Sequence, residues 1–243
     1  YFVNVGPTIS RQVQQTQQTA KQLLPNNDIT QSFYFEPVTC SEIETIIKLL
    51  KPKTSSGCDG ISPKFIKSIS LNSIVPPITH IVNQSLEKGI FPEDMKLSKV
   101  TPIFKSGEPN SSKNYRPISV LPSISKILEK VVYKRLYSFL IKHNILSPSQ
   151  FGFRQNLSTE LAILEMQDRI IKHKLEKSLC VGMFLNLSKA FDSSDHSILL
   201  DKLAHYGIRG LPLNWFNSYL DNRKQYIHIS NTDSEPMNIS HGV

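Results

Sequence analysis

The sequence predicts a mixed α/β fold of the α+β class, in which helices interleave with a few short strands. Apolar residues recur with the period of a helix over long segments, the clearest of which are 123–142 and 158–177. Strand-like patterns are fewer and shorter, and they occupy residues 99–105, 115–121, 179–185 and 224–230. The 243 residues, of which 39% are hydrophobic, suffice for one large or two small domains with their own core.

Composition argues against several classes of protein. No apolar run approaches the roughly 18 residues of a membrane-spanning helix, so we expect no membrane partner. The sequence shows no charged and apolar leader at Tyr1, and we therefore expect an intracellular protein without a secretory signal. Its three cysteines, Cys40, Cys58 and Cys180, lie far apart and show no metal-ligand spacing, which disfavours a zinc site or a disulfide framework.

The positive charge is concentrated in one stretch of the chain. The formal net charge is +8, and the stretch from Lys99 to Arg154 carries ten Lys or Arg residues against only Glu108 and Glu129. In the rest of the chain the basic and acidic residues balance at 18 each. A basic block inside a foldable segment predicts a polyanionic partner, which is nucleic acid, a nucleotide or anionic lipid, and the alternative is a solvated helix face.

The first elements follow from capping and breaking residues. Segment 1–36 is expected to be loosely ordered, because Gln12–Gln22 is a glutamine-rich run that suits a soft helix or a linker. Ser41-Glu-Ile-Glu44 has the pattern of a capping box and predicts the start of a helix that ends before Pro52. The apolar face of this helix consists of Ile43, Ile46, Ile47 and Leu50.

Glycine and proline mark the next boundaries. Ser55–Gly60 predicts a tight loop, and Pro63 suits the first turn of a short helix that runs to about Ile69. A further helix is predicted over 75–88, and Gly89 ends it.

A hairpin and a long helix follow. Residues 99–105 predict a strand that Pro102 places at the edge of a sheet, because proline donates no backbone hydrogen bond. After a polar turn the chain returns as a second strand over 115–121. Ser123 then caps the helix 123–142, whose apolar stripe contains Ile124, Ile127, Leu128, Val131, Val132, Leu136, Phe139 and Leu140.

The C-terminal half begins with the helix predicted over 158–177. The continuous apolar run Leu179–Leu185 predicts a buried strand. Two more helices are expected over 195–206, before Gly207, and over 212–221. The alternating residues 224–230 predict a strand in a terminal hairpin.

Four blocks of sequence carry the most specific signals, in a fixed order. They are Lys96–Lys105 with Asn114–Leu121, Gln150–Arg154, Phe184–Asp192, and Leu203–Ile208 with Trp215–Arg223. Together with the loop Ser56–Ile61 they resemble the reverse transcriptase of non-LTR (LINE-type, jockey-like) retrotransposons over roughly residues 30–243. The resemblance implies a polymerase right hand, with helical fingers over 37–178 and part of the palm sheet over 179–243. It also implies RNA template, DNA primer and deoxynucleotides as partners, and a nuclear location.

Lys105 and Arg116 are the candidate nucleotide-binding pair. Phosphoryl transfer depends on neutralising charge, and two cations on the strands of one hairpin can clamp a triphosphate. Arg116 suits this role best, because its planar fork matches phosphate oxygens. The alternatives are an exposed turn lysine for Lys105 and a structural salt bridge for Arg116.

The segment Gln150–Arg154 is the candidate nucleic-acid-binding segment. An aromatic face at Phe151 or Phe153 can stack a base, and Gly152 permits a close approach of the backbone. In the resembled family this segment lies in the fingers, near template and incoming nucleotide. The alternative is that both phenylalanines anchor the core and that Gly152 serves a turn.

The segment after the predicted buried strand carries the metal chemistry in the resembled family. Asn186 stands where that family has its first catalytic Asp, and the backbone carbonyl of Leu187 is implied as a further Mg²⁺ ligand. Because Mg²⁺ prefers carboxylates to a neutral amide, we expect it to be held poorly here. Phe191 matches the aromatic residue that senses the sugar 2′ position, with plain core packing as its alternative. Asp192 is a second candidate acid, with a helix cap or a structural role as its alternative.

The end of the sequence is a second reason to expect no catalysis. His241-Gly-Val243 matches the opening of the family's Gly-Val-Pro-Gln-Gly-Ser block, and the paired-Asp hairpin follows that block. We therefore expect a fragment that stops before the second catalytic block and that lacks polymerase activity. The alternative function is a non-catalytic nucleic-acid-binding or scaffold protein that retains the same fold.

Overall fold

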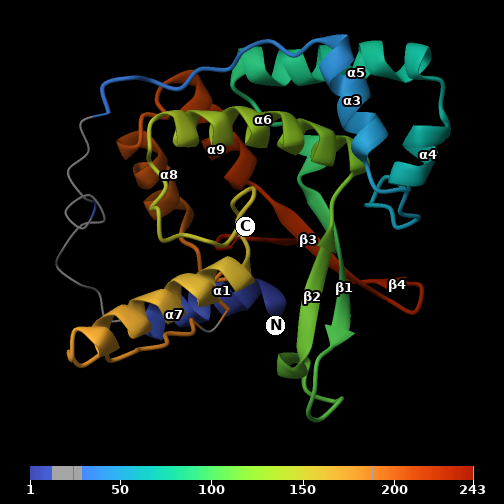
Figure 1. Ribbon diagram of the computed structural model, residues 1–243. Helices are drawn as coiled ribbons and strands as arrows, with labels where there is room; N and C mark the ends of the chain where they lie inside the picture. The colour runs from blue at the N-terminus through green and yellow to red at the C-terminus, as the bar shows by residue number, and fades with distance from the viewer. Residues whose placement is uncertain (13–23, 25–28, 188, 243) are drawn as a thin grey trace. The chain divides into compact units, whose positions relative to one another are not determined.

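The computed structural model in Figure 1 describes residues 1–12, 24, 29–187 and 189–242. The chain divides into two compact units, the first formed by Tyr1–Tyr137 with Lys189–Val243 and the second by Ser138–Ser188. The helices are η1 (Phe2–Asn4), α1 (Val5–Gln12), α3 (Cys40–Leu49), α4 (Pro63–Ser68), α5 (Leu71–Lys88), η2 (Glu93–Met95), η3 (Ser112–Asn114), α6 (Ser123–Lys142), α7 (Thr159–Leu175), α8 (His196–His205) and α9 (Leu211–Leu220). The strands are β1 (Leu97–Phe104), β2 (Tyr115–Val120), β3 (Lys224–Ile229), β4 (Thr232–Asp233) and β5 (Met237–Asn238). The mixed α+β class is confirmed.

The sheet of the first unit has the strand order β2-β1-β3-β4, and β5 also pairs with β3. β1 runs antiparallel to β2 and parallel to β3, so it lies inside the sheet and the prediction that it is an edge strand is wrong. The parallel pairing ends at Val100, however, and Pro102 lies beyond it, where β1 has β2 as its partner. Pro102 there faces Pro117, a pair that contributes no N–H to the ladder.

Helix boundaries depend on local capping. Thr39, and not Ser41, is the N-cap of α3, and its hydroxyl accepts a hydrogen bond from the backbone N–H of Glu42. The N-cap therefore lies two residues earlier than predicted, and the Glu42 side chain does not complete a capping box, because its carboxylate accepts from Arg135. The end of α5 is confirmed, since Gly89 adopts a left-handed conformation with φ of 65°.

Helices α3, α5, α6 and α9 enclose the core of the first unit (Figure 1). Its fully buried side chains include Ile43, Ile47, Val82, Phe91, Ile127, Leu128, Val131 and Trp215. The apolar stripe predicted on α6 is confirmed at Ile127, Leu128, Val131 and Val132, all buried. Ser123 is the first residue of α6, and its buried hydroxyl donates to the carbonyl oxygen of Ile61 at 2.6 Å, which fastens the helix to the preceding loop.

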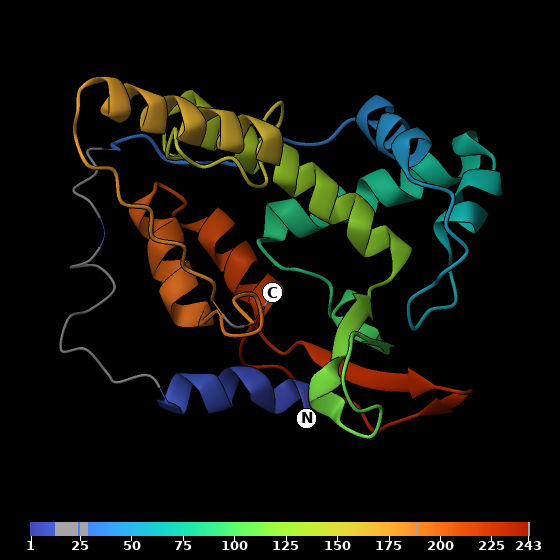
Figure 2. The same cartoon turned by 60° about the horizontal axis from the view of Figure 1, so that its bottom comes forward.

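The start of the chain contains a helix that the sequence analysis did not predict. α1 follows η1 directly, and both views place the N-terminus beside β2 (Figures 1 and 2). The glutamine-rich segment lies almost entirely outside the described residues. All three cysteines are free and exposed. None of the helices in the described ranges is long and apolar enough to cross a membrane.

The second unit contains α7, which corresponds to the helix predicted over 158–177, and Ser158 caps it by accepting from the backbone N–H of Leu161. The buried strand predicted over 179–185 is wrong: the segment has no regular structure, and Leu179 and Leu185 are 98% and 83% exposed. An apolar run becomes a buried strand only when neighbouring strands satisfy its backbone groups, and the described residues of this unit include none.

Candidate functional site

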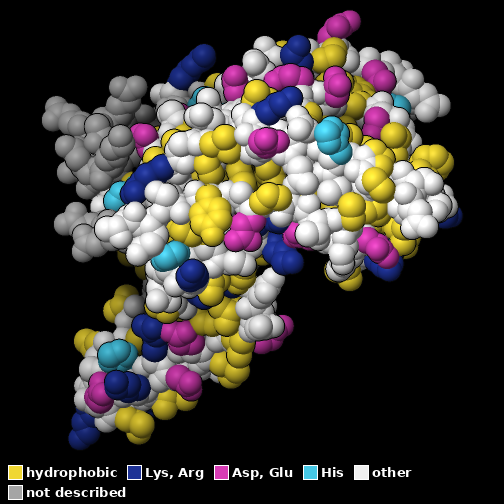
Figure 3. Space-filling view, turned by 90° about the horizontal axis from the view of Figure 1, so that it is seen from above, with side chains coloured by type: hydrophobic (Ala, Val, Ile, Leu, Met, Phe, Trp, Pro, Cys, Tyr) yellow, Lys and Arg dark blue, Asp and Glu magenta, His cyan; other side chains and the backbone are white. Residues whose placement is uncertain are grey.

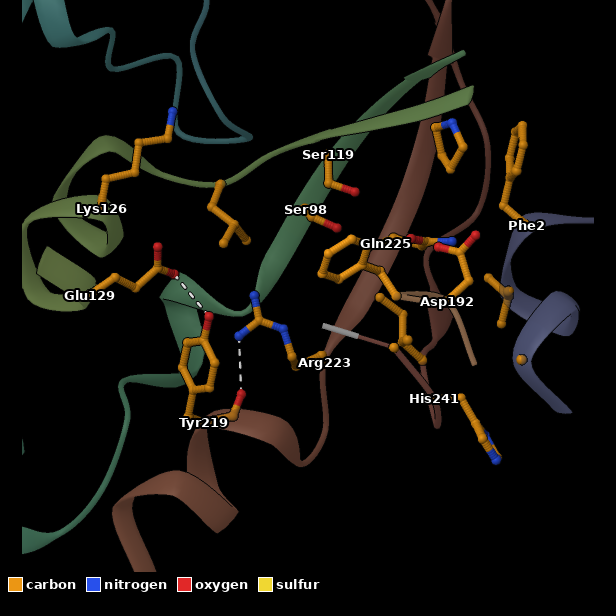
Figure 4. Close-up of a pocket in the computed structure, with 17 residues that line it drawn as sticks. Phe2, Ser98, Ser119, Lys126, Glu129, Asp192, Tyr219, Arg223, Gln225 and His241 are labelled. Carbon is orange, nitrogen blue, oxygen red and sulfur yellow. Dashed lines mark hydrogen bonds between the residues drawn. The ribbon is translucent and has the colours of Figure 1, made fainter. Parts of the chain in front are cut away.

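A cavity of about 460 Å³ lies within the first unit (Figure 4). One wall of the cavity is formed by strands β1, β2 and β3. A second is formed by α6 and the segment that joins α9 to β3. A third is formed by η1 and residues 239–242. The segment 191–192 also borders the cavity. Residues from distant parts of the chain therefore meet around one half-open cavity.

The strand wall of the cavity is one face of the sheet. Ser98 pairs with Gln225 across β1 and β3, and Val100 pairs with Ser119 across β1 and β2. Because directly paired residues point to the same face and alternate residues share a face, Ser98, Ser119 and Pro117 lie on this wall. The wall thus offers hydroxyl and amide groups to whatever occupies the cavity.

The predicted nucleotide-binding pair lies together on the opposite face of the same sheet. Arg116 pairs with Ile103, and the backbone N–H of Lys105 donates to the carbonyl oxygen of Asn114 at 2.8 Å, which continues the ladder by one step. Lys105 and Arg116 are therefore diagonal neighbours, at a Cα separation of roughly 7–8 Å. Both side chains are exposed, and no salt bridge holds either one among the described residues.

Phe191 and Asp192 border the cavity and are held there by close backbone packing. A Cβ on Gly6 would lie 2.3 Å from the carbonyl oxygen of Asp192, and one on Gly242 would lie 3.1 Å from that of Phe191. Asp192 is not a helix cap: Asp195 caps α8 by accepting from two backbone N–H groups. Phe191 is 59% exposed and lies at the rim of the cavity.

A hydrogen-bonded cluster that the sequence analysis missed lies at the other end of the cavity (Figure 4). Ser125 and Tyr219 both donate to Oε1 of Glu129, at 3.0 and 3.3 Å. Arg223 lies over the Tyr219 ring, with its guanidinium carbon 4.7 Å from the ring centre, and donates to the Tyr219 carbonyl oxygen at 3.0 Å. Burial raises the pKa of Glu129, and burial with the neighbouring Glu129 carboxylate raises the pKa of Tyr219 to about 12.

Two sequence signals pointed toward this cluster. Glu129 is one of only two acids in the basic stretch, and Arg223 ends one of the four specific blocks. The sequence alone gives no reason to pair them, because Glu129 and Tyr219 are 90 residues apart.

The predicted nucleic-acid-binding segment forms a turn in the second unit. The amide of Gln150 donates to the Gly152 carbonyl oxygen at 3.2 Å, and Nη1 of Arg154 donates to that of Ser147 at 3.0 Å. Phe151 is half-buried, whereas Phe153 is 83% exposed and has a φ of 60°. A Cβ on Gly152 would meet nothing within 4 Å, so there is open space beside its backbone.

The residues expected at the metal position do not fit a magnesium ion. Asn186 and Leu187 are exposed and lie in the irregular segment of the second unit, whereas Asp192 belongs to the first. An amide and a backbone carbonyl supply no negative charge, and Mg²⁺ binds proteins through carboxylates. Within the described ranges no three His, Cys, Asp or Glu side chains form a group that could hold a metal ion. We derive no reaction step through a metal.

Comparison with known proteins identifies the family. The model of the family "Reverse transcriptase (RNA-dependent DNA polymerase)" matches residues 103–243. The probable RNA-directed DNA polymerase from transposon BS of Drosophila melanogaster is 32% identical over 223 residues, which is 87% of this chain and 23% of that protein. Its counterpart from the X-element of the same species is 31% identical over 96% of this chain and 25% of its own length.

A third relative agrees with these two. The RNA-directed DNA polymerase from mobile element jockey of Drosophila melanogaster is 30% identical over 85% of this chain and 22% of its own length. The chain thus spans about a quarter of the length of the curated relatives that it matches. The resemblance noted in the four sequence blocks is confirmed, and the chain belongs to the reverse transcriptase (RNA-dependent DNA polymerase) family, in the branch that non-LTR retrotransposons carry.

Proposed function

We propose that this chain forms the fingers and part of the palm of an RNA-directed DNA polymerase, and that it binds an incoming deoxynucleotide together with an RNA template and a DNA primer. The observation that carries the proposal is the position of Lys105 and Arg116 as exposed diagonal neighbours on one face of the β1–β2 hairpin. Two cations so placed can contact the same triphosphate, and the guanidinium fork of Arg116 can bind two of its oxygens.

The exposed turn Gln150–Arg154 contacts the template strand. Phe153 is 83% exposed and an aromatic ring at the surface can stack on a base, and the open space beside Gly152 admits a nucleic-acid backbone. Nε of Arg154 is buried and has no hydrogen-bond partner among the described residues, and a bound strand would provide one. Phe191 borders the cavity, on the other face of the sheet from Lys105 and Arg116, and is not part of this clamp.

In this proposal the chain binds but does not polymerise, because Asn186 replaces the carboxylate that the family's metal chemistry requires. That same substitution favours a second candidate, a nucleic-acid-binding or scaffold protein that retains the fold. A location in the nucleus, where a primer on chromosomal DNA is available, is part of the first candidate.

Nucleotide binding tests the proposal directly. Titration with a fluorescent deoxynucleoside triphosphate should show that Arg116→Gln and Lys105→Gln each weaken binding about tenfold, since each removes one charge-assisted contact. Lys113→Gln is the matched control, because Lys113 is an exposed lysine in the turn of the same hairpin. Equal affinities for all four proteins would contradict the clamp.

A further inference from the structure

The cavity carries two cationic side chains from different elements at one end. Lys126 extends from α6, and Arg223 from the segment before β3 (Figure 4). We propose that this end of the cavity binds a phosphate group. The site goes beyond the proposed function, because Lys105 and Arg116 lie on the opposite face of the sheet.

Arg223 is oriented by its neighbours and retains donors for a ligand. The Tyr219 ring supports one face of the guanidinium, and the Tyr219 carbonyl oxygen accepts from Nη1. An arginine has five N–H donors, and within the described chain Nε and Nη2 of Arg223 have no hydrogen-bond partner. In Figure 4 the guanidinium lies between Tyr219 on one side and Ser98 with Ser119 on the other. A fixed fork with free donors matches the oxygens of a phosphate.

The surrounding polar groups complete such a site. The Lys126 side chain is half-buried and makes no hydrogen bond or ion pair with any described residue, so its ammonium is available. The side chains of Ser119 and Gln225 line the cavity and are likewise unpaired within the described ranges. A hydroxyl, an amide, an ammonium and a guanidinium all donate hydrogen bonds, which is the set that a phosphate accepts.

The acidic residues of the cavity do not oppose this assignment. Glu129 lies beside both cations and is the carboxylate at this end, so two positive charges face one negative charge. Burial also raises the pKa of Glu129, which makes its neutral form easier to reach when an anion enters. Asp192, the other acid, lies across Gln225 from Arg223 (Figure 4).

The size of the cavity permits two sources of the phosphate. A volume of about 460 Å³ accommodates a free polyphosphate or one phosphodiester of a nucleic-acid strand. Inorganic pyrophosphate and octathymidylate are therefore the two probes. If either probe binds in a way that depends on Arg223, the result supports the site and shows whether its phosphate comes from a free polyphosphate or from a nucleic-acid strand.

The experiment is calorimetric titration of the full chain in a background that lacks the hairpin clamp, Lys105→Gln with Arg116→Gln. We expect this background protein to bind at least one probe, and Arg223→Gln added to it to weaken that binding at least about tenfold. Lys126→Gln should have a similar effect, and we expect this variant to stay folded, because the Lys126 side chain makes no hydrogen bond or ion pair with any described residue. Lys64→Gln, at an exposed lysine on α4, is the control.

Glu129→Gln supplies a test of opposite sign. The amide oxygen still accepts from Ser125 and Tyr219, but the negative charge is gone, so affinity should rise several-fold. Loss of all binding in the clamp-free background would overturn the cavity site and leave the hairpin clamp intact. Unchanged affinity of both Arg223→Gln and Lys126→Gln, or weaker binding by Glu129→Gln, would also overturn it.

Discussion

Arg135 donates from Nη1 and Nη2 to the two carboxylate oxygens of Glu42, each at 3.0 Å, and so joins α6 to α3. The same guanidinium also donates to the carbonyl oxygens of Glu36 and Pro37. Only 12% of the Arg135 side chain is exposed. One of the ten cations in the basic stretch is therefore structural, although the sequence gives no sign that it differs from its neighbours.

Removing this arginine should destabilise the fold. Arg135→Gln leaves the Glu42 carboxylate without its bidentate partner, and we expect a loss of about 2–3 kcal/mol in the free energy of unfolding. Lys130→Gln, an exposed change on the same helix, should cost no more than about 0.5 kcal/mol. Urea denaturation of the parent and both variants measures the difference, and similar midpoints would refute the structural role.

Burial on α6 gives a second prediction about stability. Leu128 is fully buried in the core, so Leu128→Ala should lower the free energy of unfolding by about 2–5 kcal/mol. Val131→Asp should destabilise the protein further, because it places an unpaired carboxyl in the same core. Lys130→Ala is the exposed control. Thermal melting that shifts equally for Leu128→Ala and Lys130→Ala would show that this face of the helix is not packed.

Stability at alkaline pH should depend on Tyr219. Its pKa is raised from 10.0 to about 12, so the folded state holds the phenolic proton more tightly than the unfolded chain. The stabilisation is complete below pH 10 and is lost as the pH rises toward 12. At about pH 11 it has decreased by about 1.4 kcal/mol. Tyr219→Phe lacks this ionisation. Between about pH 9 and about pH 11 its free energy of unfolding, measured by urea denaturation, should therefore fall by about 1.4 kcal/mol less than that of the parent. Identical pH profiles would argue against a buried Tyr219.

Nucleic-acid binding should be weak, tolerant of sequence and strongly dependent on salt. Contacts between lysines and phosphates release counterions, so affinity for octathymidylate or an RNA of similar length should fall at least about tenfold from about 50 to about 200 mM salt. Lys130→Glu should weaken binding without touching the Arg135 pair, since Lys130 is exposed and forms no ion pair among the described residues, whereas Lys134 lies 3.7 Å from the Glu42 carboxylate that Arg135 binds. Fluorescence anisotropy measures both effects, and an affinity that is indifferent to salt would contradict them.

Repair of the metal position is the test of catalysis. Asn186→Asp should raise affinity for divalent ions but should not by itself give polymerase activity, because two ions in a phosphoryl-transfer site need several carboxylates. Joining the continuation of a related element after Val243 while keeping Asn186 should also give little synthesis. Both changes together should give RNA-templated primer extension.

The comparison requires four proteins: the parent, Asn186→Asp, the extended chain, and the extended chain with Asn186→Asp. Robust extension by the parent or by Asn186→Asp alone would contradict the proposed cause of inactivity. Extension by the chain that keeps Asn186 would show that the amide is tolerated.

Local signals in the sequence predicted most of the elements. Gly89 and the helical periodicity of 123–142 and 158–177 are local signals, and in the structure α5 ends at Gly89 and helices α6 and α7 occupy the two periodic segments. The errors concern relations across the chain. The parallel pairing of β1 with β3 depends on residues more than a hundred positions apart, and no local pattern encodes it.

The same distinction applies to the candidate site. The diagonal placement of Lys105 and Arg116 follows from one hairpin, so two strands and a turn in the sequence were enough to suggest it. The cluster of Glu129 and Arg223 joins α6 to the segment before β3, and it becomes visible only once the chain has folded. Long-range packing of polar residues leaves no periodic trace in a sequence.

The exposed run Leu179–Leu187 gives the chain a segment through which copies of it can associate. Its nine residues contain no charge and no proline, and its apolar side chains face solvent. Segments of this composition can stack into cross-β assemblies in which each copy satisfies the backbone groups of the next. Two such chains that meet can therefore supply each other with the strand neighbour that neither has within its own second unit, and protein concentration sets how often that happens.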